Sequence, residues 1–171
     1  MEEAAHLFQE KLGIDAAQFL ELCNHQSFIR SLGIDAPTLE GFLFPETYRL
    51  PEGEHPKKII KIIVGEYQQL VDDSVRQRMK RINLTELETV TLASIIEGEA
   101  IYDSERPIIS AVYHNRLKKG MRLQADPTIQ YIIEDSPRRL LNEDLKIESP
   151  YNTYRNYGLP PGPINNPGKE S

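Results

Sequence analysis

The sequence predicts an α+β protein that is predominantly α-helical, with few short strands. Three observations support this class: several segments place apolar residues at helical spacing, strand signals are weak throughout, and proline- and glycine-rich segments separate the helical ones. The chain has 171 residues, 39% hydrophobic and 27% charged, which is the usage of an ordinary folded protein and enough length to bury a core.

The pattern divides the chain into two parts. Residues 1–33 form an N-terminal helical segment of two short helices, broken near Gly13, with Asp15 as the N-cap of the second. We expect this segment to be the remnant of a preceding region and residues 34–171 to form the main domain. The main domain opens with a proline-rich stretch in which residues 41–48 place three aromatic side chains around Glu46, as in an apolar loop that lies against a core or lines a cleft.

Helices dominate the main domain. One long amphipathic helix is expected from Pro56, with a single apolar face that reaches Met79. Thr85 and Glu88 form a capping box that starts a second helix, which is apolar nearly all round and therefore buried. Two more helices are expected. The first starts near Asp103, is terminated by Gly120, and has a buried side made of Ile108, Ile109, Val112 and Leu117. The second is short, with Asp126 as its N-cap and Pro127 as its first residue.

Composition excludes several classes of function. A net charge of −6 argues against nucleic-acid binding, which requires a basic face. The single cysteine, Cys23, excludes an intrachain disulfide, and the four histidines lack metal-ligand spacing. Neither a glycine-rich phosphate loop nor a lysine in an apolar setting is present, so we expect no metal and no cofactor, pyridoxal phosphate included. No apolar run is long enough to cross a bilayer, and no signal-peptide pattern opens the chain.

Glu97 stands out because it is a carboxylate on a face of the buried helix. One interpretation is structural: the side chain reaches solvent at the helix end or pairs with an arginine. The other is a general acid whose pKa is raised by apolar surroundings, so that it carries a proton at neutral pH. Glu99 lies on a different helical face and fits a structural role or polar substrate contacts.

Two further segments contain candidate binding residues. Arg122 and Gln124 alternate in a short stretch that, if extended, directs both to one side, and an amide suits sugar hydroxyls and N-acetyl groups. The alternative is an ordinary joint between two helices. Tyr151, Tyr154 and Tyr157 occur within seven residues, and an aromatic face with a polar tip suits a pyranose ring, whereas a mobile polar tail is the alternative.

Four segments in order resemble the YceG-like endolytic murein transglycosylases. They are residues 39–48 (LEGFLFPETY), residues 92–99 (LASIIEGE), residues 115–117 with 120–128 (NRL and GMRLQADPT), and residues 151–154 with 158–164 and 166–168 (YNTY, GLPPGPI and NPG). The resemblance covers residues 39–168 and implies that residues 34–171 are a transglycosylase catalytic domain.

The resemblance also implies roles for individual residues. It places the catalytic glutamate of the family on Glu97. A looser similarity to lysozyme-like transglycosylases, in which a Met-Gln stretch and a Tyr-Asn pair line the cleft, implies a lysozyme-like cleft here. The predicted substrate-binding residues are Gln124, Tyr151, Asn152, Arg122, Glu46 and Tyr154.

In the implied reaction one glutamate acts twice. It protonates the glycosidic oxygen between N-acetylmuramic acid and N-acetylglucosamine, and then accepts the proton of the muramoyl C6 hydroxyl, which closes a 1,6-anhydro ring. Two alternatives stay open: a hydrolytic muramidase in which Glu46 or Asp126 positions water, and a non-catalytic glycan-binding module of the cell-wall machinery.

The resemblance bears on extent and location as well. Members of the family have an N-terminal membrane helix and a LysM-like region before the part seen here, and continue past the Asn-Pro-Gly motif. We therefore expect a catalytic domain that is truncated at its C-terminus, from an extracytoplasmic protein anchored by a transmembrane helix. Peptidoglycan strands, and peptidoglycan synthases, are the expected partners.

Overall fold

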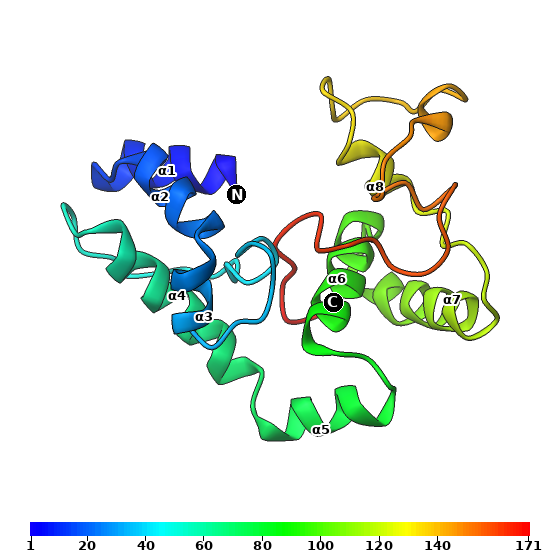
Figure 1. Ribbon diagram of the computed structural model, residues 1–171, viewed down its shortest axis with the longest axis horizontal. Coiled ribbons are helices and arrows are strands. Elements are labelled where there is room, and N and C mark those ends of the chain that lie inside the picture. The colour runs from blue at the N-terminus through cyan, green and yellow to red at the C-terminus, as the bar shows by residue number, and fades with distance from the viewer. The chain divides into compact units, whose positions relative to one another are not determined.

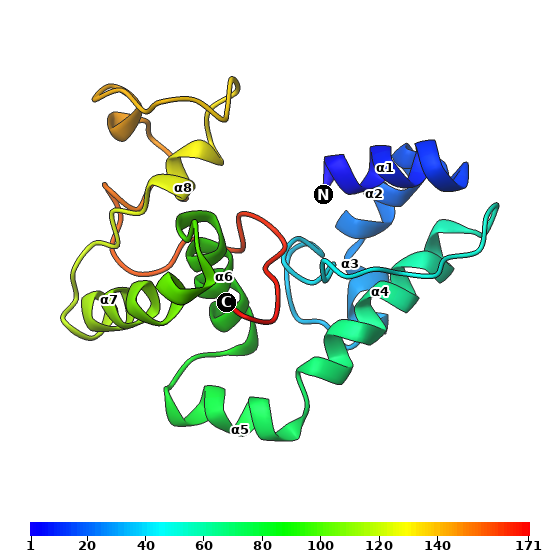
Figure 2. The same ribbon diagram turned by 180° about the vertical axis from the view of Figure 1, so that it is seen from behind.

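The computed structural model describes residues 1–171, and these residues form helices and no β-strand (Figures 1 and 2). The predominance of helix is confirmed, while the predicted short strands are not found. The chain separates into two compact units, residues 1–87 and 88–171. None of the helices has the length and apolar character needed to span a lipid bilayer.

Unit 1 starts with three short helices rather than the predicted two. Gly13 adopts a positive φ of 66° and ends the first helix, and the Asp15 carboxylate accepts a hydrogen bond from the Gln18 amide, as predicted. His25 then ends the second helix and begins the third. The bounds are α1 Glu2–Leu12, α2 Ala16–Asn24 and α3 Gln26–Ser31.

The long helix expected from Pro56 is two helices, α4 (Pro56–Leu70) and α5 (Asp73–Arg81), so that prediction is wrong. Val71 leaves the helical region with φ −87° and ψ 66°. The Asp72 carboxylate accepts a hydrogen bond from the Val75 amide and starts a new helix. The apolar spacing in the sequence continues through the break at Val71, Val75 and Met79, and it concealed the capping signal of Asp72.

The apolar loop at residues 41–48 lies against the core of unit 1. Phe42 is 1% exposed, and its ring meets that of Tyr67 edge-on at 5.1 Å between centroids. Glu46, in contrast, is exposed and lies in the irregular second half of this loop. The loop therefore buries Phe42 and Phe44, half-buries Tyr48 and leaves its carboxylate at the surface of unit 1.

Unit 2 is organised around α6 (Glu86–Glu99), which begins one residue after Thr85, where the predicted capping box places it. The irregular C-terminal segment, residues 159–171, runs beside this helix in both views (Figures 1 and 2). The Ser94 hydroxyl accepts a hydrogen bond from the Ile164 amide at 3.1 Å, and the Asn165 side chain donates to the Ser94 carbonyl at 2.8 Å. These contacts attach the segment to the buried face of α6.

The other helices of unit 2 are α7 (Arg106–Lys118), preceded by a 3₁₀ turn at Asp103–Glu105, α8 (Asp126–Gln130), and a second 3₁₀ turn at Asp144–Lys146. Gly120, with φ 62°, follows the end of α7 as predicted. The N-cap of α8 is Ala125 and not the predicted Asp126, because the helix starts one residue earlier than the capping pattern suggested.

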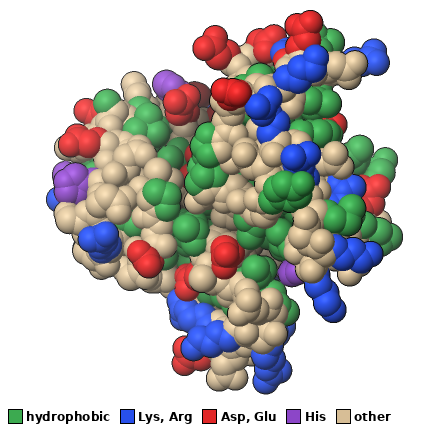
Figure 3. All heavy atoms as spheres, turned by 45° about the vertical axis from the view of Figure 1, so that its right-hand side comes forward, with side chains coloured by type: hydrophobic (Ala, Val, Ile, Leu, Met, Phe, Trp, Pro, Cys, Tyr) green, Lys and Arg blue, Asp and Glu red, His purple; other side chains and the backbone are tan.

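The predicted buried side of α7 is wrong. Ile108 is 68% exposed and Val112 is 44% exposed, whereas Tyr113 is 4% exposed. Hydrophobic side chains accordingly lie at the surface among lysine and arginine side chains (Figure 3). The apolar residues of α7 spread over much of its circumference, so the spacing alone did not determine which side packs against the rest of unit 2.

Candidate active site

Glu97 lies in the last turn of α6, and its side chain is 31% exposed. Its Oε1 accepts a hydrogen bond from Arg106 Nη2 at 3.1 Å, in an ion pair with the first residue of α7. Its Oε2 accepts from the Gly168 amide at 3.2 Å and from the Ser171 hydroxyl at 2.7 Å. Donors from α7 and from the C-terminal segment therefore converge on one carboxylate.

These donors reverse the expected ionisation of Glu97. Burial is the largest single influence and favours the neutral acid, but the hydrogen bonds from Ser171 and Gly168 and the charge of Arg106 together outweigh it. The pKa of Glu97 is therefore lowered, and the expectation of a raised pKa is wrong. The sequence suggested an apolar setting because the neighbours of Glu97 on α6 are apolar, whereas its polar partners come from other segments.

Glu99 has the opposite balance, although it is only two residues further along α6. Burial of its carboxyl group raises its pKa, and the negative charge of Asp126 adds to this effect, against a hydrogen bond with Tyr113 and the charge of Arg116 that lower it. The net result is a raised pKa. Of the two glutamates at the end of α6, Glu99 is the one whose surroundings favour the protonated form.

Gly98, between them, allows α8 to approach α6. A Cβ atom at this position would lie 2.8 Å from Cβ and 3.1 Å from Cγ of Pro127, and 3.4 Å from Nδ2 of Asn165. The first distance is shorter than real Cβ contacts. The unfavourable glycine in this helix therefore has a packing reason, because it makes room for the proline in the first turn of α8.

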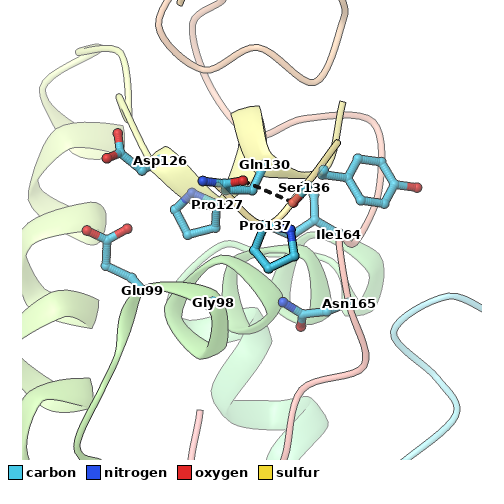
Figure 4. Close-up of a pocket in the computed structure, with 10 residues that line it drawn as sticks. Gly98, Glu99, Asp126, Pro127, Gln130, Ser136, Pro137, Ile164 and Asn165 are labelled. Atoms are coloured by element: carbon cyan, nitrogen blue, oxygen red, sulfur yellow. Dashed lines mark hydrogen bonds between the residues drawn. The ribbon is translucent and has the colours of Figure 1, made fainter. Parts of the chain in front are cut away.

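A hollow of about 510 Å³ lies beside this contact (Figure 4). Glu99 and Asp126 lie on one side of it, and the Ser136 hydroxyl donates to the Gln130 amide oxygen at 3.0 Å on another (Figure 4). Its lining residues mix carboxylate, amide, hydroxyl and apolar groups, and are Gly98, Glu99, Asp126, Pro127, Gln130, Tyr131, Ser136, Pro137, Ile164 and Asn165. Glu97 is not among them, so the hollow adjoins the other side of the α6 terminus.

The two predicted binding segments pair with each other. The backbone amide of Gln124 donates to the Thr153 carbonyl at 3.1 Å. The Thr153 hydroxyl accepts a hydrogen bond from the backbone amide of Ala125 at 3.0 Å and lies 2.9 Å from the Thr128 hydroxyl. Thr153 is the buried joint between the two segments, and the sequence did not single it out. The structure therefore brings residues 121–128 and 151–154 together.

Arg122 and Gln124 do not lie in an extended stretch. Gln124 has a positive φ of 51°, which is uncommon for a residue other than glycine. Both Arg122 and Gln124 are exposed. The Arg122 guanidinium lies over the ring of Tyr157, 4.6 Å from its centroid. The predicted extended stretch is therefore interrupted at Gln124, while the exposed Arg122 and Gln124 still alternate with the buried Leu123 and Ala125.

The residues of the Tyr-Asn-Thr-Tyr motif separate into surface and interior positions. The ring of Tyr151 lies 4.9 Å from that of Tyr131, which lines the hollow, and the Tyr154 hydroxyl donates to the Asp126 carboxylate. Asn152 is 0% exposed, and its amide donates to the carbonyls of Leu145 and Ile147 while accepting from the Tyr154 amide. In this conformation Asn152 shapes the loop from inside, and it presents no surface to a ligand.

Glu46, the remaining predicted binding residue, belongs to unit 1, whereas the others belong to unit 2. Its backbone amide donates to the Phe44 carbonyl at 3.1 Å. The 171 residues contain no group of three or more histidine, cysteine or acidic side chains arranged to hold a metal ion.

Arg106 is the main residue at this site that the sequence did not identify. A signal was present, because a cation in the first turn of a helix faces the positive end of the helix dipole and is unfavourable there. The partner of such a residue must be found in space, and Glu97 and Ser171 lie 9 and 65 residues away from it in the sequence.

Comparisons with known proteins agree with the resemblance. The model of the YceG-like family matches residues 1–171, and the chain belongs to this family. An endolytic murein transglycosylase of Bacillus subtilis is 42% identical over 134 residues, which cover 78% of this chain and 37% of that protein. One from Streptococcus pneumoniae (strain D39) is 32% identical and covers 96% of this chain and 33% of its own length.

A solved structure is similar as well. The crystal structure of a yceG-like protein, lmo1499 from Listeria monocytogenes, is 31% identical with a TM-score of 0.85, and the match covers 99% of this chain and 60% of that one. The chain thus spans about a third of the length of the curated relatives that it matches.

Proposed function

We propose that this chain contributes the catalytic part of a lytic transglycosylase that cleaves peptidoglycan glycan strands internally, with Glu97 as the acid–base residue. The relatives named endolytic murein transglycosylases support the reaction class. The structural observation behind the role of Glu97 is the convergence of Arg106, Gly168 and Ser171 on a carboxylate that keeps 31% of its side chain exposed. A carboxylate that is fixed in place and still reachable suits an acid–base catalyst.

The proposed chemistry needs one carboxyl group. Protonated Glu97 gives its proton to the glycosidic oxygen that joins N-acetylmuramic acid to N-acetylglucosamine, and the C1–O bond breaks. The resulting carboxylate accepts the proton of the muramoyl C6 hydroxyl as that oxygen bonds to C1. The products are a 1,6-anhydro end and a free N-acetylglucosamine hydroxyl, and Glu97 is protonated again without consuming water.

The hollow beside Glu99 supplies groups that suit a glycan. Gln130 and Asn165 are amides, Ser136 is a hydroxyl, and Tyr131 offers an aromatic face that is 41% exposed. Such a mixture can hydrogen-bond sugar hydroxyls and acetamido groups and stack on a pyranose ring. We propose that a sugar next to the cleaved bond occupies this hollow and that Tyr151 and Tyr154 contact the sugar at the edge of the hollow.

Product analysis tests the reaction. Purified glycan strands are incubated with the protein, and the new ends are identified by mass spectrometry. Anhydro-muramoyl ends support the transglycosylase, whereas reducing muramoyl ends, heavier by one water, indicate the alternative of a hydrolytic muramidase. Strand binding without cleavage indicates a glycan-binding module. Peptidoglycan lies outside the cytoplasmic membrane, so this activity places the protein there.

A further inference from the structure

Arg106 occupies a position that helix electrostatics disfavour. It is the first residue of α7, where the free amides of the helix end create positive potential. Its side chain is nevertheless only 13% exposed. Contacts outside the helix must therefore hold the guanidinium in place.

The three guanidinium nitrogen atoms of Arg106 each contact a different residue. Nη2 donates to Glu97 Oε1 at 3.1 Å, Nε donates to the Ser171 hydroxyl at 2.8 Å, and Nη1 contacts the Asp103 carboxylate. The Ser171 hydroxyl in turn donates to Glu97 Oε2 at 2.7 Å. Arg106 thus reaches one carboxylate oxygen directly and the other through a hydroxyl, which fixes the rotation of the carboxylate plane as well as its position.

We propose that Arg106 is a positioning residue for Glu97: its direct hydrogen bond and the Ser171 hydroxyl that it contacts set the orientation of the carboxylate. Its charge also contributes to the lowered pKa of Glu97. This inference rests on the proposed function of Glu97. Since the reaction begins with a protonated acid, the proton must be gained when a glycan covers the site. Exclusion of water by the ligand strengthens the effect of burial, which already favours the neutral form of Glu97.

Other charged groups on the neighbouring elements are already paired or directed elsewhere. Asp103 pairs with Arg106 itself, and Lys169 lies 4.0 Å from Glu170. Glu105 accepts hydrogen bonds from the backbone amides of Ile101 and Tyr102. Glu99, on the same helix, bonds to Tyr113 on the side of α6 that faces Asp126. Arg106 is therefore the cation that acts on Glu97.

A carboxyl titration tests the inference without any activity measurement. The protein is labelled with ¹³C at the glutamate side chains, and the Glu97 signal, assigned by its loss in Glu97→Gln, is followed against pH by NMR. We expect Arg106→Gln to raise the midpoint of Glu97, and Arg106→Lys to raise it less because the charge is kept. The matched control is Arg155→Gln, which removes an arginine paired with the exposed Glu148 and should leave Glu97 unchanged.

The kinetics of strand cleavage provide the second readout. Misplacing a catalytic group by about 1 Å slows a reaction by roughly 100-fold, so Arg106→Gln should lower kcat by about 10- to 100-fold with little change in KM. Its activity should persist to higher pH than that of the parent protein, because its Glu97 keeps a proton longer. Arg106→Lys should recover part of the rate.

The two proposals can fail separately. A folded Arg106→Gln protein with an unchanged Glu97 midpoint, or with the parent rate and pH profile, overturns the positioning role. A parent protein that binds strands but does not cleave them overturns the proposed function, while the NMR midpoint still shows whether Arg106 controls the ionisation of Glu97.

Discussion

Glu97 and Glu99 lie two residues apart on opposite sides of the C-terminal end of α6, and their surroundings differ. Glu97 faces the start of α7 and the C-terminal segment, and it accepts hydrogen bonds from Arg106, Gly168 and Ser171. Glu99 faces Tyr113 and Asp126 beside the hollow. The pKa of Glu97 is lowered because its hydrogen bonds and the charge of Arg106 outweigh the desolvation of its carboxylate. The pKa of Glu99 is raised because desolvation and the charge of Asp126 outweigh the hydrogen bond from Tyr113 and the charge of Arg116.

This difference separates two requirements of an acid–base site. A raised pKa provides a proton, and a set of fixed donors provides position. The first property belongs to Glu99 and the second to Glu97. The assignment of catalysis to Glu97 therefore depends on a rise in its pKa on ligand binding, and the experiments below test whether the two glutamates differ in function as they do in environment.

Replacing each glutamate in turn gives the largest expected effect. Glu97→Gln keeps the size of the side chain but removes the transferable proton, so strand cleavage should fall by about 10²- to 10⁴-fold, the usual contribution of a general acid or base. Glu99→Gln should retain cleavage and the anhydro product. Release of soluble glycan measures both, with strand binding as the control for folding. The reverse result, loss in Glu99→Gln alone, would assign catalysis to Glu99.

Filling the space at Gly98 should disturb the Glu99 side through packing. Gly98→Ala places a methyl group 2.8 Å from Pro127 Cβ, and overpacking of this kind costs about 1–3 kcal/mol, offset in part by the better helix propensity of alanine of about 1 kcal/mol. We expect a net loss in the free energy of unfolding in urea. Gly65→Ala is the matched control, because Gly65 lies inside α4 with nothing within 4 Å of the added Cβ, and should stabilise. Equal effects of the two changes would contradict the close contact at Gly98.

The pH dependence of stability should have opposite signs for the two glutamates. The lowered pKa of Glu97 means that its ionised form stabilises the fold above the ordinary value of 4.5, and that this contribution is lost as the pH falls through the folded-state pKa. The raised pKa of Glu99 means that stability declines as the pH rises from 4.5 through its folded-state pKa. Subtracting the unfolding free energies of Glu97→Gln and Glu99→Gln from those of the parent across this range should give slopes of opposite sign.

The smallest expected effect is that of Tyr113→Phe. This change removes the hydrogen bond that lowers the pKa of Glu99, so the Glu99 midpoint should rise further while that of Glu97 stays unchanged. Loss of one such hydrogen bond should cost about 1 kcal/mol of stability. Carboxyl NMR measures both midpoints at once, and a shift of Glu97 would show that the two sides of α6 are electrostatically coupled.

Local signals in the sequence determined much of the secondary structure. Asp15 and Gly120 were identified as helix boundaries, and the start of α6 follows Thr85, because caps act on backbone groups within a few residues. The failures also have local causes. The capping signal of Asp72 was overlooked within a continuous apolar pattern, and the wide apolar surface of α7 left its buried side undetermined.

The sequence by itself determined that this is a mainly helical YceG-like chain, that Glu97 lies at the end of a buried helix, and that residues 121–128 and 151–154 are candidates for one site. The tertiary structure decided the ionisation of Glu97 and Glu99, the interior position of Asn152, and the joint at Thr153. The physical reason is distance along the chain. Helix spacing and caps depend on neighbours in sequence, whereas burial and pKa depend on neighbours in space, and Ser171 reaches Glu97 across 74 residues.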